Sequence, residues 1–173
     1  MNIKIFAHQV IYFCIGLLII FFQILPLQTI PQTWSGPNVL LVFFAAIVSK
    51  RPEFTSSFLI GSIFLIEDFF LMRPPGLMSS LTVLGFFFLK RKFQNQEVNS
   101  FILGWGSVTT CLTIILLLYY FISLLLFIPS AGLKLTLMEL IVTLALYPIF
   151  SVLIGSFDKL NLTDAEKKIY YGR

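Results

Sequence analysis

The chain has 173 residues, of which 58% are hydrophobic and 12% are charged, with a formal net charge of +4 and a mean hydropathy of +0.94. Apolar stretches of membrane-spanning length recur along it, and no polar block is long enough to form a soluble domain, so the composition indicates an all-α, polytopic membrane protein. The basic balance is typical of loops that orient a membrane protein and touch anionic headgroups; the basic residues form no face with interleaved aromatics, so no nucleic-acid partner is expected.

Hydropathy predicts helices near residues 9–27, 37–49, 54–72, 77–89, 101–127 and 135–157. We expect the first to be retained rather than cleaved, because it exceeds a signal-peptide core and no small-x-small site follows it. The second and fourth would span only about 20 Å of a roughly 30 Å hydrocarbon core. Each is therefore expected to be a short helix in a thinned or protein-shielded region, or a re-entrant segment.

The basic residues predict the orientation of these six helices. Ten of the twelve Lys and Arg residues fall in alternate loops and at the two termini, leaving Arg73 and Lys134 on the other side. By the positive-inside rule both termini are expected in the cytoplasm, and the protein in a bacterial inner membrane with multiple passes. We expect one transmembrane domain over residues 1–157 and a short cytoplasmic tail over 158–173, whose marginal helix would be disordered without a partner.

Two adjacent acids, Glu67 and Asp68, lie inside the third apolar run. A charge near the bilayer centre costs roughly 2.5–3.5 kcal/mol on insertion scales, so an intramembrane acid indicates a functional or assembly site. Neighbouring helical positions point about 100° apart, which disfavours two acids sharing one proton. We expect one acid to face the bundle interior, near Arg73, Lys134, a helix N-terminus or backbone donors, and the other to reach the outer interface.

The third helix is expected to end at Arg73-Pro74-Pro75-Gly76. Arg73 precedes a proline and is pushed into an extended conformation, neither proline donates an N–H, and Gly76 permits positive φ. The plain interpretation is a rigid reversal between two membrane helices. The functional alternative is that the rigid turn presents Arg73 to a partner or back to Asp68.

Short patterns follow one another along the chain: Pro37-Asn38 at the start of the second helix, Arg51-Pro52 in the next turn, Asp68 late in the third helix, and Pro75-Gly76-Leu77 after it. This order, together with the length and helix pattern of the whole chain, resembles the bacterial rod-shape-determining MreD family. Members of that family often carry Pro-Asp at the second helix start. Asn38 is a neutral isostere, which keeps a helix-end hydrogen bond without the negative charge.

The resemblance implies a non-enzymatic inner-membrane scaffold of the cell-elongation machinery, acting in rod shape and lateral peptidoglycan synthesis. MreD-like proteins associate with the bitopic protein MreC, and with it link MreB filaments to the polymerase RodA and its partner transpeptidase. Small residues at helical spacing, Ser57 with Gly61 and Ala45 with Ser49, would let a partner helix approach closely, or would pack within the protein itself. Membrane lipids are the remaining expected partners.

The sequence contains few residues that could carry out catalysis or bind a metal. His8 is the only histidine, and beyond Glu67 and Asp68 there is no acidic cluster or cysteine pair, so neither a catalytic nor a metal site nor a cofactor is expected. The alternative function is a small-solute subunit, since the size resembles substrate-capture subunits of energy-coupling-factor transporters, although their Ala-x-x-x-Ala docking motif appears only as Ala45-x-x-x-Ser49. Polar residues that could line its cavity are Gln23, Gln28, Gln32, Asn38, Glu67, Asp68, Glu139 and Tyr147.

Overall fold

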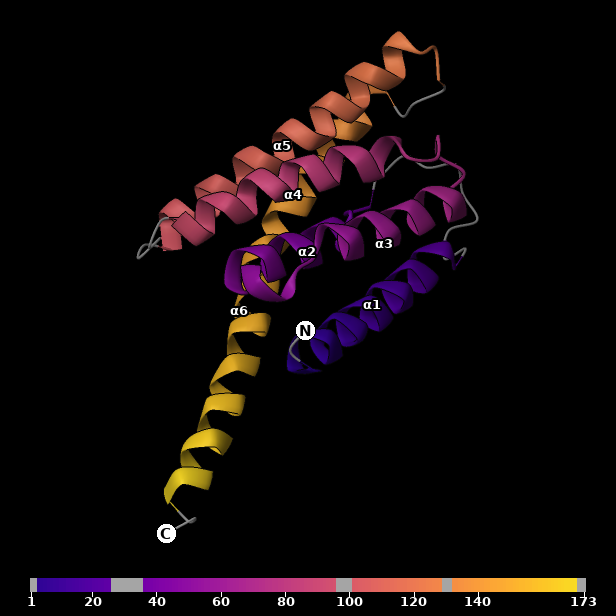
Figure 1. Ribbon diagram of the computed structural model, residues 1–173. Helices are drawn as coiled ribbons and strands as arrows, with labels where there is room; N and C mark the ends of the chain where they lie inside the picture. The colour runs from indigo at the N-terminus through magenta and orange to yellow at the C-terminus, as the bar shows by residue number, and fades with distance from the viewer. Residues whose placement is uncertain (1–2, 26–35, 96–100, 129–131, 171–173) are drawn as a thin grey trace.

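The computed structural model describes residues 3–25, 36–95, 101–128 and 132–170, and within them it is helical with no strand. Figure 1 shows the helices gathered as a bundle. The elements are α1 (Ile3–Ile24), α2 (Val39–Lys50), the 3₁₀ turn η1 (Pro52–Phe54), α3 (Ser57–Phe70), α4 (Leu77–Asn95), α5 (Phe101–Leu125) and α6 (Leu133–Tyr170). The predicted all-α class is confirmed, and all six predicted helices are present.

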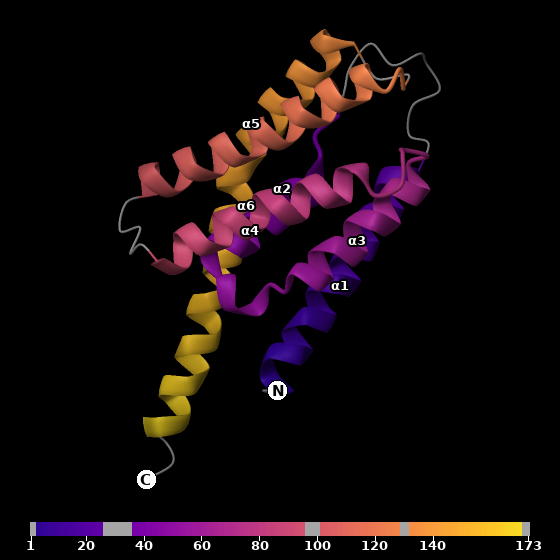
Figure 2. The same cartoon turned by 45° about the horizontal axis from the view of Figure 1, so that its top comes forward.

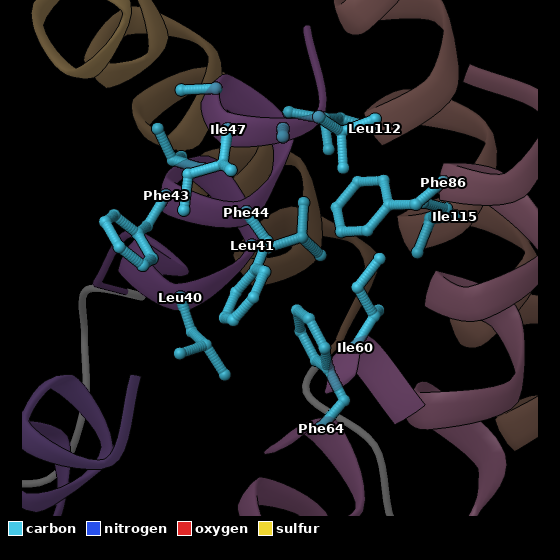
Figure 3. Close-up of a cluster of buried hydrophobic side chains, with 14 of the residues drawn as sticks. Leu40, Leu41, Phe43, Phe44, Ile47, Ile60, Phe64, Phe86, Leu112 and Ile115 are labelled. Carbon is cyan, nitrogen blue, oxygen red and sulfur yellow. The ribbon is translucent and has the colours of Figure 1, made fainter. Parts of the chain in front are cut away.

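The short helix α2 forms the centre of the molecule. Every residue from Leu40 to Val48 is buried, and α2 packs against α1, α4, α5 and α6. Figure 3 shows its side chains meeting those of α3, α4 and α5, with the ring centroids of Phe44 and Phe64 5.7 Å apart. A helix that is apolar all round is buried by neighbours on every side. Protein therefore shields α2 from lipid, which was one of the alternatives predicted for a segment of this length.

Three helical stretches among the described residues are long and apolar enough to cross a membrane: Phe6–Ile24, Gly104–Leu125 and Leu133–Gly155. The other helices do not meet this criterion. α2 has 12 residues and α3 has 14, while α4 has 19 but contains the basic residues that follow Leu89. The chain is therefore a membrane protein by its three apolar helices, with shorter helices packed among them.

The predicted bounds of four helices were wrong. The first helix begins at Ile3 rather than at residue 9, and the other three differ for local reasons. The third helix begins at Ser57 rather than at residue 54, because Pro52 opens a separate 3₁₀ turn and Ser56 then caps α3 by accepting a hydrogen bond from Phe58 N. α4 continues past residue 89 to Asn95, since Lys and Arg are good helix formers. α6 continues through the expected tail to Tyr170, because extending an existing helix is far easier than nucleating a new one.

Contacts bring one set of helix ends together. The ring of His8 in α1 stacks on Phe54 of η1 with centroids 4.7 Å apart, and Lys90 Nζ donates to the carbonyl of Thr55 at 2.6 Å. The start of α1, the end of α2 and the basic part of α4 thus share one end of the bundle. In Figure 2, α6 extends beyond the other helices toward the C-terminus.

Candidate functional site

The carboxyl of Asp68 connects the end of α3 to the start of α4. Its Oδ2 accepts hydrogen bonds from Gly76 N at 3.0 Å and from Ser79 N at 3.3 Å. Gly76 immediately precedes α4 and Ser79 lies in its first turn, where backbone N–H groups have no partner inside the helix. Gly76 has no side chain to cap that turn, so Asp68 supplies the capping group from the preceding helix. We call the group Asp68, Arg73, Gly76 and Ser79 the Asp68 corner.

The backbone of Asp68 also ends its own helix. Arg73 N donates to the Asp68 carbonyl at 3.0 Å, and Met72 N donates to the Phe69 carbonyl at 3.3 Å. Met72 takes the left-handed conformation, with φ 51°. This pair of bonds is the Schellman arrangement that closes many helices. α3 therefore ends at Phe70, before the Arg73-Pro74 step that was predicted to end it, and Asp68 fixes both sides of the reversal.

Glu67 is as buried as Asp68 but is bonded differently. Both acids have no exposed surface, so the expectation that one of them reaches the outer interface was wrong. Neither carboxyl oxygen of Glu67 has a hydrogen-bond partner among the described residues, and Oδ1 of Asp68 has none either. Glu67 lies close enough to Arg73, Asp68 and Glu139 for their charges to interact. A buried polar group without partners is uncommon in native structures and marks a place for closer study.

A cavity of about 270 Å³ adjoins the Asp68 corner. Its wall includes Arg73, Glu139, Thr136 and two tyrosines of α5, so it carries both charged and aromatic groups. The guanidinium of Arg73 lies over the ring of Tyr119, 5.8 Å from its centroid. Of the polar residues expected to face a cavity, Glu139 lines this one. Gln28 and Gln32 lie outside the described residues.

The Pro37-Asn38 pattern starts α2 and links it to α6. Asn38 Oδ1 accepts from Leu41 N at 3.1 Å, which confirms the helix-end hydrogen bond predicted for the neutral isostere. Its backbone N–H donates to Thr143 Oγ1 at 3.1 Å. Asn38 therefore caps one helix and contacts another, and it needs no negative charge for either bond.

The Arg51-Pro52 pattern lies at the other end of α2. Arg51 N donates to the Ile47 carbonyl at 2.7 Å and ends the helix, and the Arg51 guanidinium lies 5.3 Å from the centroid of the Phe54 ring. Pro52 begins η1 at a position where its missing N–H costs nothing. The structure thus places the motif residues at three separate helix junctions rather than in one pocket.

Sequence reasoning missed side-chain bonds that join distant segments of the chain. Ser49 Oγ and Tyr147 Oη lie 2.9 Å apart and join α2 to α6, although Tyr147 was expected to face an outward cavity. Lys90 Nζ bonds the Thr55 carbonyl. Small polar residues in apolar helices are the one available signal for such bonds, but they do not identify the partner. Ala45 is fully buried, so the Ala45–Ser49 face packs inside the protein.

A Cβ added to Gly61 would lie 3.3 Å from Val83 Cγ2, so Gly61, from the Ser57–Gly61 pair, faces α4.

No group of three or more His, Cys, Asp or Glu residues that could hold a metal ion occurs in the described part of the chain. The Asp68 corner fixes a turn: its carboxylate accepts hydrogen bonds from backbone N–H groups and so sets the direction in which α4 leaves α3.

No protein-family model, curated protein or solved structure matches the chain.

Proposed function

We propose that this chain is a non-enzymatic scaffold of a bacterial inner membrane, of the MreD kind, with six membrane-embedded helices and both termini in the cytoplasm. In this proposal it binds an MreC-like bitopic protein and, through it, RodA, the partner transpeptidase and MreB filaments. Its contribution to rod shape and lateral peptidoglycan synthesis is to hold that partner in the membrane.

The observation that carries the proposal is the bond from Gly76 N to Asp68 Oδ2. The resemblance to MreD depends in part on an acid followed eight residues later by glycine, and this bond gives the spacing a physical reason. The acid caps the helix that the glycine begins, so the two residues act as one structural unit. The other motif residues, Asn38 and Arg51, also bond helix ends. Motif residues that hold helix ends in place are typical of a scaffold, which acts by keeping a defined shape for its partners.

The test is affinity purification of the tagged chain from its native membrane in mild detergent, followed by mass spectrometry of the bound proteins. The proposal expects a bitopic MreC-like protein together with cell-wall polymerases. Asp68→Ala should reduce the recovered partner several-fold, and Asp68→Asn, which keeps one acceptor oxygen for the α4 cap, should reduce it less.

A matched control separates loss of the interface from general loss of stability. Gly85→Ala adds a Cβ that would lie 2.6 Å from Ile115 Cδ1, at the contact of α4 with α5 rather than at the reversal between α3 and α4. If Gly85→Ala lowers stability as much as Asp68→Ala but leaves the partner bound, the corner itself supports the partner. Equal partner loss in both variants, or recovery of no bitopic protein, would contradict the proposal.

The cavity beside the corner favours a second candidate function, the binding of a small solute. Its roughly 270 Å³ is near the lower limit of ligand pockets, about 300 Å³. Arg73 and Glu139 offer one group of each charge, which suits a small zwitterion. Recovery of ATPase subunits or of a retained solute in the same purification, with solute loss on Glu139→Gln, would support this function in place of the scaffold.

A further inference from the structure

A second, larger hollow lies beside the central helix contacts. It has a volume of about 460 Å³ and is formed between α4 and α5. Its lining includes Leu81, Leu84, Phe88 and Lys92 of α4 and Ile114 and Leu118 of α5. The α4 positions fall at helical spacing on one face, so the hollow is a groove that follows the two helices rather than a round pocket. We call it the α4–α5 groove.

The floor of the groove depends on a glycine. At Gly85 an added Cβ would lie 2.6 Å from Ile115 Cδ1 and 3.3 Å from Cys111 Sγ. The missing side chain lets α5 come close to α4 at the floor, while the large side chains of Leu84, Phe88, Ile114 and Leu118 stay exposed along the walls. The apolar groove is thus open to the surroundings of the bundle, which for a membrane protein are lipid chains.

The dimensions of the groove limit what can occupy it. Between Leu81 and Lys92 the axis of α4 advances about 16 Å. Spread over that length, the volume corresponds to a cross-section of about 28 Å². An α-helix with its side chains is about 10–12 Å across, so its side chains could enter this groove but its backbone could not. A single hydrocarbon chain is narrow enough, and the length suits most of one acyl chain.

The charge of the groove is confined to one end. Lys92 lines it three residues before α4 ends at Asn95, and Lys90 and Arg91 precede it. The rest of the lining is uncharged, and its polar side chains are the hydroxyls of Ser107 and Thr110 and the thiol of Cys111. This order, a long apolar channel closed by an ammonium at the end of a helix, matches a phospholipid: the chain occupies the channel and the phosphate meets the cation.

We infer that the α4–α5 groove is a binding site for an anionic phospholipid, with one acyl chain between Leu84, Phe88, Ile114 and Leu118 and the phosphate on Lys92. The site is independent of the Asp68 corner and of the proposed scaffold role. It would hold one lipid per chain at the basic end of α4 and make the packing of α4 against α5 sensitive to the lipid composition of the membrane.

Native mass spectrometry of the full chain in mild detergent micelles, doped with equimolar phosphatidylglycerol and phosphatidylcholine, tests this inference. The wild-type protein should retain one lipid, predominantly phosphatidylglycerol. Lys92→Gln should lower the retained phosphatidylglycerol about fivefold relative to phosphatidylcholine, while Lys92→Arg should preserve it. Arg91→Gln is the matched control, because it removes the same charge from a neighbouring exposed residue that does not line the groove.

A second pair of variants tests the acyl-chain part of the site. Ile114→Trp adds bulk to an exposed wall residue and should abolish retention of both lipids, whereas Leu117→Trp, on the same helix but outside the lining, should not. Equal losses in Lys92→Gln and Arg91→Gln would overturn the inference in favour of general attraction to a basic segment. Retention unchanged in Ile114→Trp, or a co-purified protein segment protecting the groove from lipid, would also overturn it.

Discussion

Glu67 and Asp68 are adjacent and equally buried, yet their side chains meet different surroundings. Asp68 Oδ2 accepts hydrogen bonds from two backbone N–H groups at the start of α4, while both oxygens of Glu67 are without a hydrogen-bond partner among the described residues. Replacing a bonded group strands its donors in the interior, but replacing an unbonded buried group removes a desolvation cost. The two acids should therefore respond oppositely to apolar substitution.

We predict that Asp68→Leu lowers the free energy of unfolding by about 1–3 kcal/mol, because it leaves Gly76 N and Ser79 N unsatisfied. Glu67→Met should raise it by about 1 kcal/mol, since Met keeps the shape of the side chain without its buried oxygens. Unfolding by sodium dodecyl sulfate in mixed micelles, followed by circular dichroism, measures both. A loss of stability in Glu67→Met would show that Glu67 has a stabilising partner.

Part of this residue-level difference could be predicted from the sequence. The sequence indicated that an acid in an apolar helix needs backbone donors or a helix N-terminus, and Asp68 has both. It could not predict that Glu67 would be buried as well. The roughly 100° between neighbours places them on different faces, but whether a face meets lipid or protein depends on helices that are distant in the sequence.

At the scale of the helices, glycine positions determine how closely they approach. Gly85 →Ala would place a Cβ against Ile115, which is itself 2% exposed and has little room to move. We predict a loss of about 1–3 kcal/mol in unfolding free energy from this overpacking. Gly106→Ala is the control on α5: nothing lies within 4 Å of its added Cβ, so it should be neutral or stabilising by about 0.5–1 kcal/mol. Thermal unfolding in detergent separates the two, and equal effects would refute the close contact.

The bond between Ser49 and Tyr147 joins the central helix α2 to the last helix, α6. Interhelical hydrogen bonds in membrane proteins contribute about 0.6 kcal/mol on average and up to about 1.7 kcal/mol. A double-mutant cycle of Ser49→Ala and Tyr147→Phe should give a coupling in this range, measured from the unfolding free energies of the four proteins. Additive losses would mean that the two hydroxyls do not interact.

Predicted helices and observed helices differ mainly where polar residues are involved. Hydropathy placed the end of the fourth helix at residue 89, yet α4 continues through Lys90 to Asn95. It also placed residues 158–173 outside the last helix, but α6 reaches Tyr170. Hydropathy measures where a segment prefers lipid, while helix length depends on local propensity and on the absence of Pro and Gly. The bounds of an apolar segment and the bounds of its helix therefore agree only within the apolar part of the chain.

For the whole molecule, the placement of charge predicts orientation. Contacts of His8, Arg51 and Lys90 gather around η1 and Thr55 at one end of the bundle, while Arg73 lies at the α3–α4 reversal. By the positive-inside rule the η1 end should be cytoplasmic. Alkaline phosphatase fused after residue 132 should therefore be active, and the same enzyme fused after residue 95 or at the C-terminus should be inactive. Activity of the C-terminal fusion would reverse the proposed orientation.

The position of α2 could not be predicted from composition alone. Its sequence from Val39 to Lys50 is as apolar as that of a lipid-facing helix, and hydropathy does not distinguish a lipid environment from a protein one. Its shortness was the available signal: a segment of 12 residues spans about 18 Å, less than the hydrocarbon core. The sequence therefore allowed a protein-shielded helix but could not name the helices that surround it.

The burial of α2 has a consequence for biosynthesis. A ribosome delivers the chain from the N-terminus, so α2 emerges long before α6, the helix with which it shares the bonds at Asn38 and Ser49. Until α6 enters the membrane, Thr143 and Tyr147 are missing and one side of α2 has no protein neighbour. The nascent protein should thus remain a substrate for membrane quality-control proteases until its last helix is inserted, and chains cut short before α6 should be degraded rather than accumulate as partial bundles.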